Sequence, residues 1–130
     1  MSDNSILAER HYLDLNVPLS DCRLISVSPK VYRFLFRLNM RNTGKLGLRL
    51  LGRKWIMCDH EGHTYIIEAD HIFGQDPLLL PNAVFSFGGF HDFPEIPKSL
   101  ELRIFGIDQM LTPFISQPCV FNKRHFRISA

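Results

Sequence analysis

The feature that most constrains the fold of this chain is a two-residue alternation over residues 31–41. Every even position from 32 to 40 carries a large apolar side chain, and arginines occupy three of the odd positions. Side chains alternate between the two faces of a β-strand, so one face of this segment enters a core and the other meets solvent. We predict exposure of Arg33, Arg37 and Arg41, and a core that contains Tyr32, Phe34, Phe36, Leu38, Trp55, Phe85 and Phe87.

Short apolar segments separated by turn residues continue along the chain, and none has the periodicity of a surface helix. The turn residues at 42–45 predict a hairpin between residues 31–41 and 46–58. Gly62 predicts a second hairpin that leads into residues 64–70. Further extended segments are expected at residues 12–17, 22–27, 84–87, 100–107 and 114–121. Seven or eight strands without intervening helices predict an all-β fold, an antiparallel β-sandwich of the immunoglobulin or fibronectin type III kind.

The length of 130 residues suits one domain. We expect the sandwich at residues 11–122, a flexible segment at residues 1–10 and a basic tail at residues 123–130. Three cysteines cannot all pair with one another, and the first residues lack the basic start of a secretory signal. We therefore expect a reduced, cytoplasmic protein. We expect no membrane association, because no apolar run approaches the ~20 residues that span a bilayer.

Basic and acidic side chains are unevenly distributed, although the formal net charge is only +2. Residues 30–54 contain eight lysines and arginines and no acidic residue, whereas residues 59–108 contain nine acidic residues and two basic ones. The small overall excess argues against a nucleic-acid partner. Two interpretations of the asymmetry stay open. The charges pair across neighbouring strands, or they form a polarised surface that orients an acidic protein partner.

Residues 49–59 read R-L-L-G-R-K-W-I-M-C-D, and Gly62 follows them. This segment resembles the middle of the ApaG domain family, which runs approximately Q-L-L-S-R-H-W-I-I-T-D-x-x-G. The family's next pattern, G-E-Q-P-x-L-x-P-G-x-x-F, is matched by Gly74, Pro77, Leu79, Pro81 and Phe85. The resemblance extends in order over residues 31–121. It implies a fibronectin type III-like sandwich, in a family of small bacterial proteins whose domain also occurs in certain F-box proteins and a polymerase-interacting protein.

This chain lacks most of the glycine-rich loop of the family that it resembles. The family's G-x-G-x-x-G suggests phosphate binding, because bare backbone N–H groups can approach an anion. The aligned residues here are Ala69, His71 and Gly74, and nearby carboxylates such as Glu68 would repel a phosphate. We therefore expect no binding of a dinucleoside polyphosphate at pH 7.5. A small-ligand or phosphate- or nucleotide-binding domain that uses this loop is the alternative function.

The candidate interaction surface combines the arginine row with an aromatic segment. Residues 87–94, F-G-G-F-H-D-F-P, predict a loop, because two glycines and a proline are unfavourable inside a strand. Exposed aromatic side chains in such a loop often anchor protein partners, although Phe90 and Phe93 could instead cap the end of the sandwich. The candidate residues are Arg33, Arg37, Arg41, Phe90, His91 and Phe93.

Residues 58–63, C-D-H-E-G-H, contain side chains that bind metals, but they crowd into one tight turn. A structural zinc site would need a second pair of ligands elsewhere, so we expect a solvated hairpin turn. No nucleophile motif or acid–base pair stands out. We predict no catalytic, metal or cofactor site. The sequence therefore favours a non-enzymatic protein-interaction or regulatory module, with an unidentified protein partner and a second copy of the chain as a further partner.

Overall fold

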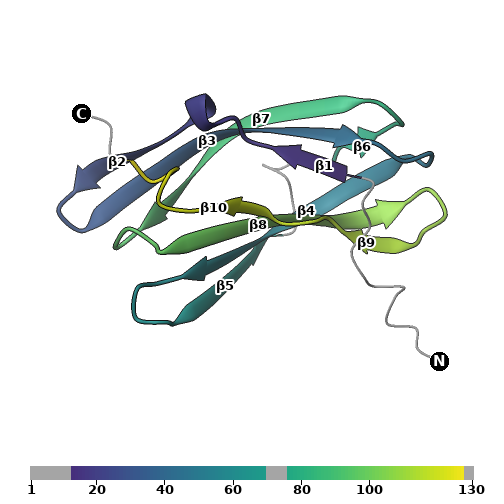
Figure 1. The fold of residues 1–130 in the computed structure, drawn as a ribbon. Helices are drawn as coiled ribbons and strands as arrows, with labels where there is room; N and C mark the ends of the chain where they lie inside the picture. The colour runs from purple at the N-terminus through teal and green to yellow at the C-terminus, as the bar shows by residue number, and fades with distance from the viewer. Residues whose placement is uncertain (1–12, 70–75, 128–130) are drawn as a thin grey trace.

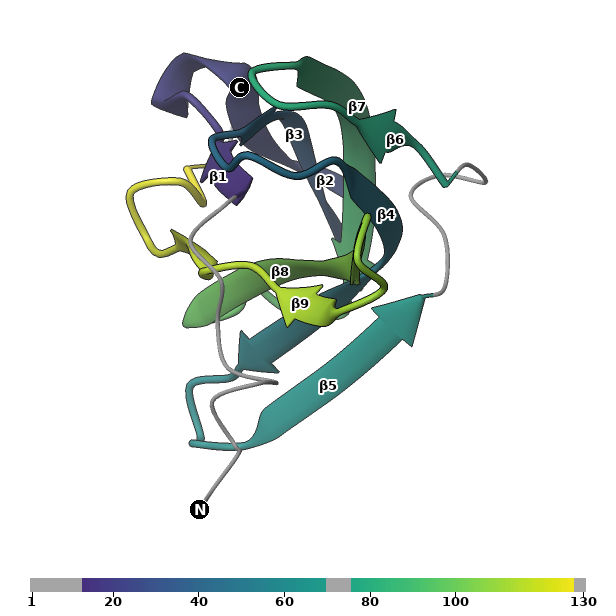
Figure 2. The same cartoon turned by 90° about the vertical axis from the view of Figure 1, so that its right-hand side faces the viewer.

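The structure is a computed structural model that describes residues 13–69 and 76–127. These residues form ten β-strands and one short 3₁₀ helix, arranged as two antiparallel sheets that face each other (Figures 1 and 2). The predicted antiparallel β-sandwich is therefore confirmed. The expected segment at residues 1–10 lies outside the described residues. Within the described part of the chain, no helix has the length and apolar character that crossing a membrane requires.

The first sheet is organised around its longest strand, β3 (Val31–Asn42). Strand β7 (Val84–Phe93) runs antiparallel along one edge of β3. The other edge of β3 is shared by β2 (Cys22–Ser28) and β1 (Leu13–Asn16), which pair with its first and last residues respectively. The 3₁₀ helix η2 (Leu19–Asp21) connects β1 to β2. The twelve-residue strand β3 therefore pairs with all three other strands of this sheet.

Two long strands, β4 (Leu48–Cys58) and β8 (Ser99–Asp108), form the centre of the second sheet. The outer edge of β4 holds β5 (Thr64–Ala69) and β6 (Leu78–Leu79), and the outer edge of β8 holds β9 (Pro113–Ile115) and β10 (Cys119–Phe121). The predicted strand at residues 114–121 is two strands here, with Pro118 in the segment between them. The described residues thus form ten strands where seven or eight were predicted, and the shortest of them, β6, β9 and β10, have only two or three residues each.

The core lies between the sheets and follows the alternation in the sequence. Phe34, Phe36 and Leu38 of β3 and Trp55 of β4 are buried, as predicted. The rings of Phe36 and Trp55 meet edge to face with their centroids 5.4 Å apart, which joins the two sheets. The other predicted core residues are only half-buried, because they lie at the end of β3 or on the edge strand β7: Tyr32, Phe85 and Phe87.

The predicted hairpin between residues 31–41 and 46–58 is wrong, because β3 and β4 belong to different sheets. The buried side chain of Asn42 explains the crossing. Its Nδ2 donates to the carbonyls of Leu46 (2.8 Å) and Leu79 (2.9 Å), and its Oδ1 accepts from the Gly44 N–H (2.9 Å). The residues after Asn42 therefore turn toward the second sheet instead of pairing back on β3.

The predicted loop at residues 87–94 is also wrong for most of its length, because β7 continues through Phe93. Gly88 and Gly89 pair with Arg37 and Phe36 of β3, and neither glycine has a positive φ. Glycine weakens a strand but does not interrupt one that is paired along its whole length. The consequence for function is that Phe90 is held on a sheet rather than on a loop.

The packed part of the chain extends beyond the predicted boundary at residue 122. Phe126 is only 5% exposed, and its ring meets Phe34 edge to face at a centroid distance of 5.3 Å. The carbonyl of Arg127 accepts a weak hydrogen bond from the N–H of Leu24 in β2 (3.4 Å). Residues 123–127 were expected to form a tail, but an aromatic anchor docks them against the core.

Candidate interaction surface

The outer face of the first sheet brings the arginines of β3 together with the exposed residues of β7. Opposed residues of antiparallel strands point to the same face, and the register places Leu35 opposite Phe90 and Arg37 opposite Gly88. Arg23 joins them from β2, where it pairs with Leu35. We call this surface the arginine–phenylalanine face, and it consists of Arg23, Arg33, Leu35, Arg37, Arg41, Val84, Gly88, Phe90 and Asp92.

Phe90 is held in place on this face although its side chain is 54% exposed. The guanidinium of Arg33 lies 4.2 Å from the centroid of the Phe90 ring. Arg33 also donates two hydrogen bonds to Asp92, Nε to Oδ1 at 2.7 Å and Nη2 to Oδ2 at 2.9 Å. These hydrogen bonds hold the pKa of the Asp92 carboxyl below its usual value. Asp92 thus fixes Arg33, and Arg33 supports the aromatic ring.

An open hollow of about 580 Å³ lies beside Phe90. Gly88 and Leu35 line it together with Arg23, Arg37 and Asp21. A Cβ atom on Gly88 would come no closer than 3.7 Å to any other heavy atom, so the backbone tolerates a side chain there. The hollow therefore lies over the two glycines of β7, Gly88 and Gly89, which carry no side chains to fill it.

Three arginines of the face retain free hydrogen-bonding capacity. In residues 13–69 and 76–127, the side chains of Arg23, Arg37 and Arg41 take part in no hydrogen bond or ion pair, whereas Arg33 is bound to Asp92. All three are exposed. The interpretation that the charges pair across neighbouring strands therefore holds for Arg33, and the interpretation of a surface for an acidic partner stays a prediction for the other three arginines.

Four of the six predicted interaction residues lie on this face, namely Arg33, Arg37, Arg41 and Phe90. The other two, His91 and Phe93, were wrongly placed there. Phe93 belongs to the buried core, and the His91 ring packs between Phe93 (centroids 4.7 Å apart) and Trp55 (5.6 Å). Burial lowers the pKa of His91, and the neighbouring Arg53 lowers it further, against the opposite influence of Asp92. Sequence reasoning missed Arg23 and Gly88, whose positions depend on strand pairing.

Of the residues of the alternative ligand loop, Ala69 lies within the described residues. Ala69 is the last residue of β5 and is partly buried. Ala69 pairs with Arg53 of β4, and a side chain on the adjacent Gly52 would collide with the Ala69 carbonyl, so the two strands approach closely there. His71 and Gly74 lie outside the described residues.

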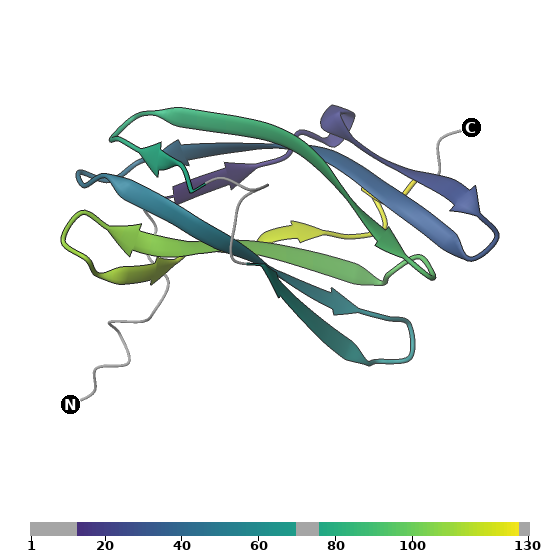
Figure 3. The same cartoon turned by 180° about the vertical axis from the view of Figure 1, so that it is seen from behind.

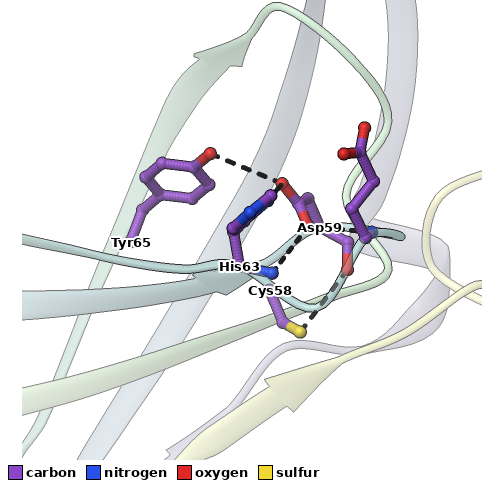
Figure 4. Close-up of polar contacts among 5 residues, drawn as sticks. Cys58, Asp59, His63 and Tyr65 are labelled. Carbon is purple, nitrogen blue, oxygen red and sulfur yellow. Dashed lines mark hydrogen bonds and ion pairs between the residues drawn. The ribbon is translucent and has the colours of Figure 1, made fainter.

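The acidic turn at residues 58–63 is a structural hairpin turn with Asp59 buried at its centre (Figure 4). The Asp59 carboxylate accepts from the N–H groups of Glu61 (2.9 Å) and His63 (2.8 Å), lies 3.1 Å from Nδ1 of His63, and accepts from the Tyr65 hydroxyl (3.4 Å). Desolvation alone raises the pKa of Asp59, but the contacts with His63 and Glu61 outweigh it and hold the pKa below its usual value.

These contacts occupy the carboxylate that a metal would need. Across the described ranges, no group of three His, Cys, Asp or Glu side chains is arranged to hold a metal ion. The hairpin after β4 was predicted correctly, and Gly62 has the positive φ of +90° that its turn requires. Residues 60–63 of this turn are exposed, as expected, whereas Asp59 is buried.

Comparison with known proteins gives relatives in both sequence and structure. Protein ApaG of Acidovorax sp. (strain JS42) is 37% identical over 57 residues, which are 44% of this chain and 42% of that protein. Protein ApaG of Methylococcus capsulatus is 36% identical over 56 residues, 43% of this chain and 44% of that protein. The matched segment thus spans less than half of the length of these relatives.

Two solved structures share the fold over nearly the whole chain. A structural genomics target has a TM-score of 0.74 at 16% identity and covers 95% of this chain and 96% of its own. A Bordetella pertussis protein that carries the name ApaA has a TM-score of 0.69 at 21% identity, with 88% and 95% coverage. The ApaG domain family model matches residues 25–101, from β2 into β8 and thus through the centres of both sheets. This match covers more than half of the chain, and we conclude that the chain belongs to the ApaG domain family.

Proposed function

We propose that this ApaG domain is a non-enzymatic protein-interaction module and that its arginine–phenylalanine face binds an acidic partner surface. The observation that carries the proposal is the exposed ring of Phe90, which Arg33 and Asp92 hold in one position beside a hollow. Ordering an exposed side chain on binding costs about 0.5–1.5 kcal/mol. A ring that is ordered beforehand avoids most of this cost and suits the role of an anchor.

The chemistry of the face indicates the kind of partner that it fits. The free guanidinium groups of Arg23 and Arg37 flank the hollow, and each can form a bidentate pair with a carboxylate. Leu35 and Phe90 supply apolar surface between them. A partner segment with an apolar side chain for the hollow and aspartate or glutamate on either side would satisfy both kinds of contact.

The surroundings of Asp59 and His91 support a non-catalytic role. The Asp59 carboxylate is engaged within its own turn, and the His91 ring is packed between aromatic side chains. A general acid or base must reach a substrate proton, which neither arrangement favours. Binding alone then provides the regulatory effect of the module.

Site-specific photocross-linking in the cells that express the chain tests the proposal. A photoreactive amino acid replaces Phe90 in one variant and Val120, an exposed residue of β10 on the other sheet, in a control. We expect a specific protein adduct from the Phe90 position and none of the same mass from the Val120 position. The adduct should disappear when Gly88→Glu fills the hollow with an acidic side chain, and persist in the matched control Gly88→Ala.

The identified partner then allows a kinetic test. Replacement of Arg37 and Arg41 by Glu should slow association at least tenfold at low salt, and the difference should shrink as salt screens the charges. Recovery of the same adducts from all variants would contradict the proposal.

A calorimetric titration with a dinucleoside polyphosphate at pH 7.5 tests the alternative function, for which we expect no heat of binding. Measurable binding there would favour a ligand-binding domain instead.

A further inference from the structure

Among the described residues, strand β5 forms an outer edge of the second sheet, and its one charged side chain is Glu68. Within the described residues it pairs only with β4, and the hairpin of β4 and β5 extends away from the first sheet (Figure 3). Three successive apolar side chains are exposed on it: Tyr65 47%, Ile66 59% and Ile67 42%. Natural edge strands usually carry a lysine, a proline or a bulge that prevents pairing with another chain. β5 has none of these protective features.

The hydrogen bonding of the hairpin shows which backbone groups face the open edge. The Asp59 N–H donates to the His63 carbonyl at 3.0 Å, which places Asp59 and His63 at a hydrogen-bonded pair position of the register, although the His63 N–H bonds to the Asp59 carboxylate and not to its carbonyl. Such pairs alternate along the strands, which directs the backbone groups of Tyr65 and Ile67 toward β4. The N–H and C=O groups of every second residue therefore face the open edge, namely those of Thr64, Ile66 and Glu68.

The edge is held in shape before any partner binds. The Asp59 carboxylate binds the N–H groups of Glu61 and His63 within the turn, and the Tyr65 hydroxyl bonds to the same carboxylate from β5 (Figure 4). The six residues of β5 pair with β4 without a register shift. Strand addition to this edge thus needs little further ordering.

We propose that β5 pairs with β5 of a second copy of this chain, antiparallel about a two-fold axis through Ile66. Ile66 then lies opposite Ile66 of the second copy, Tyr65 lies opposite its Ile67, and Thr64 lies opposite its Glu68. On one face the row of Ile56 and Ile66 continues into the same row of the second copy. Because the edge groups are those of Thr64, Ile66 and Glu68, this register forms about six backbone hydrogen bonds.

Self-pairing fits this strand because its side chains complement one another in this register alone. A two-fold axis through Ile67 would place Glu68 opposite Ile66, and an axis through Tyr65 would bring residues of the turn against the strand. With the axis through Ile66, apolar residues meet apolar residues and the two Glu68 carboxylates lie at opposite ends. Each Glu68 also lies across from Lys54 in its own β4, so no like charges oppose each other.

The mass of the full chain in solution, measured by sedimentation equilibrium over a range of concentrations, tests the proposal. We expect a monomer–dimer equilibrium in which Ile66→Lys raises the dissociation constant at least tenfold. Val120→Lys is the matched control, because Val120 is also exposed (51%) on a strand of the same sheet but lies in β10, away from β5. A wild-type chain that stays monomeric throughout, or an Ile66→Lys variant that dimerises as well as the wild type, would overturn the proposal.

Cysteine cross-linking tests the register and does not depend on the lysine variant. In the proposed pairing the two Ile66 Cα atoms are about 5.5 Å apart, a separation that a disulfide can bridge. The two Tyr65 residues are diagonal neighbours, about 7–8 Å apart, which is too far. Mild oxidation should therefore link Ile66→Cys into a dimer through residue 66 and leave Tyr65→Cys unlinked at residue 65, as shown by peptide mapping. Efficient linkage through residue 65 and none through residue 66 would refute this register.

Discussion

Asn42 is the residue at which the chain passes from one sheet to the other. Its side chain is fully buried and satisfies two carbonyls and one N–H group. Asn42→Ala should leave the carbonyls of Leu46 and Leu79 without this donor, and each such loss costs about 1–3 kcal/mol. We expect a lower free energy of unfolding in urea, measured by fluorescence of the single tryptophan, Trp55.

In the same experiment, Asn42→Asp tests the two donated hydrogen bonds of Asn42 separately from the one that it accepts. Aspartate keeps an oxygen for the Gly44 N–H but loses both donated hydrogen bonds and buries a charge. It should therefore destabilise the fold more than alanine does at pH 7. Equal stability of the aspartate variant and the wild type would show that the bonds to Leu46 and Leu79 do not hold the crossing.

His91 should make the stability of the fold depend on pH. Burial lowers the pKa of His91, so the unfolded chain binds a proton more readily than the folded chain. A group of this kind contributes stability above its unfolded pKa of about 6.5, and the contribution is lost as the pH falls toward the folded pKa. The wild type should therefore lose more thermal stability between pH 7.5 and pH 5.5 than His91→Gln does. Parallel melting curves for the two proteins would exclude His91 as the cause.

At the scale of elements, the alternation of residues 31–41 was enough to predict a strand and its buried face. It could not predict the neighbours of that strand, because a two-residue period identifies the face of a side chain and not the strand beside it. The paired glycines of β7 were interpreted as a loop for the same reason. Once β7 is known to be a strand, the alternation of its side chains between two faces places Phe90 on the outer face and His91 and Phe93 on the inner face.

The segment after β10 acts as a packed element, which truncation can test. Phe126→Ala should lower the free energy of unfolding by about 3–5 kcal/mol, because it leaves a cavity beside Phe34. The neighbouring exposed residue provides the control, and Arg127→Ala should change stability by less than about 0.5 kcal/mol. A chain that ends at residue 122 should be destabilised at least as much as Phe126→Ala. Unchanged urea unfolding of the shortened chain would contradict this packing role.

At the scale of the whole molecule, the two proposed surfaces do not compete. The arginine–phenylalanine face belongs to the first sheet, and the edge of β5 belongs to the second. A dimer formed through β5 would therefore present two arginine–phenylalanine faces. A partner with two acidic segments could bind both faces at once, which raises its apparent affinity without any new contact, provided that its linker spans the distance.

The central strand β3 has a further consequence during synthesis of the chain. Its partners in β7 lie between 43 residues (Arg41 with Val84) and 61 residues (Tyr32 with Phe93) further along. At about 5–20 residues per second, a ribosome adds that stretch in several seconds. For that time the edge of β3 that later pairs with β7 is open and the core residues of β8 have not yet emerged, although β1, β2 and β4 have already been made. We therefore expect the nascent chain at this stage to expose apolar side chains of β3 that the finished sandwich buries.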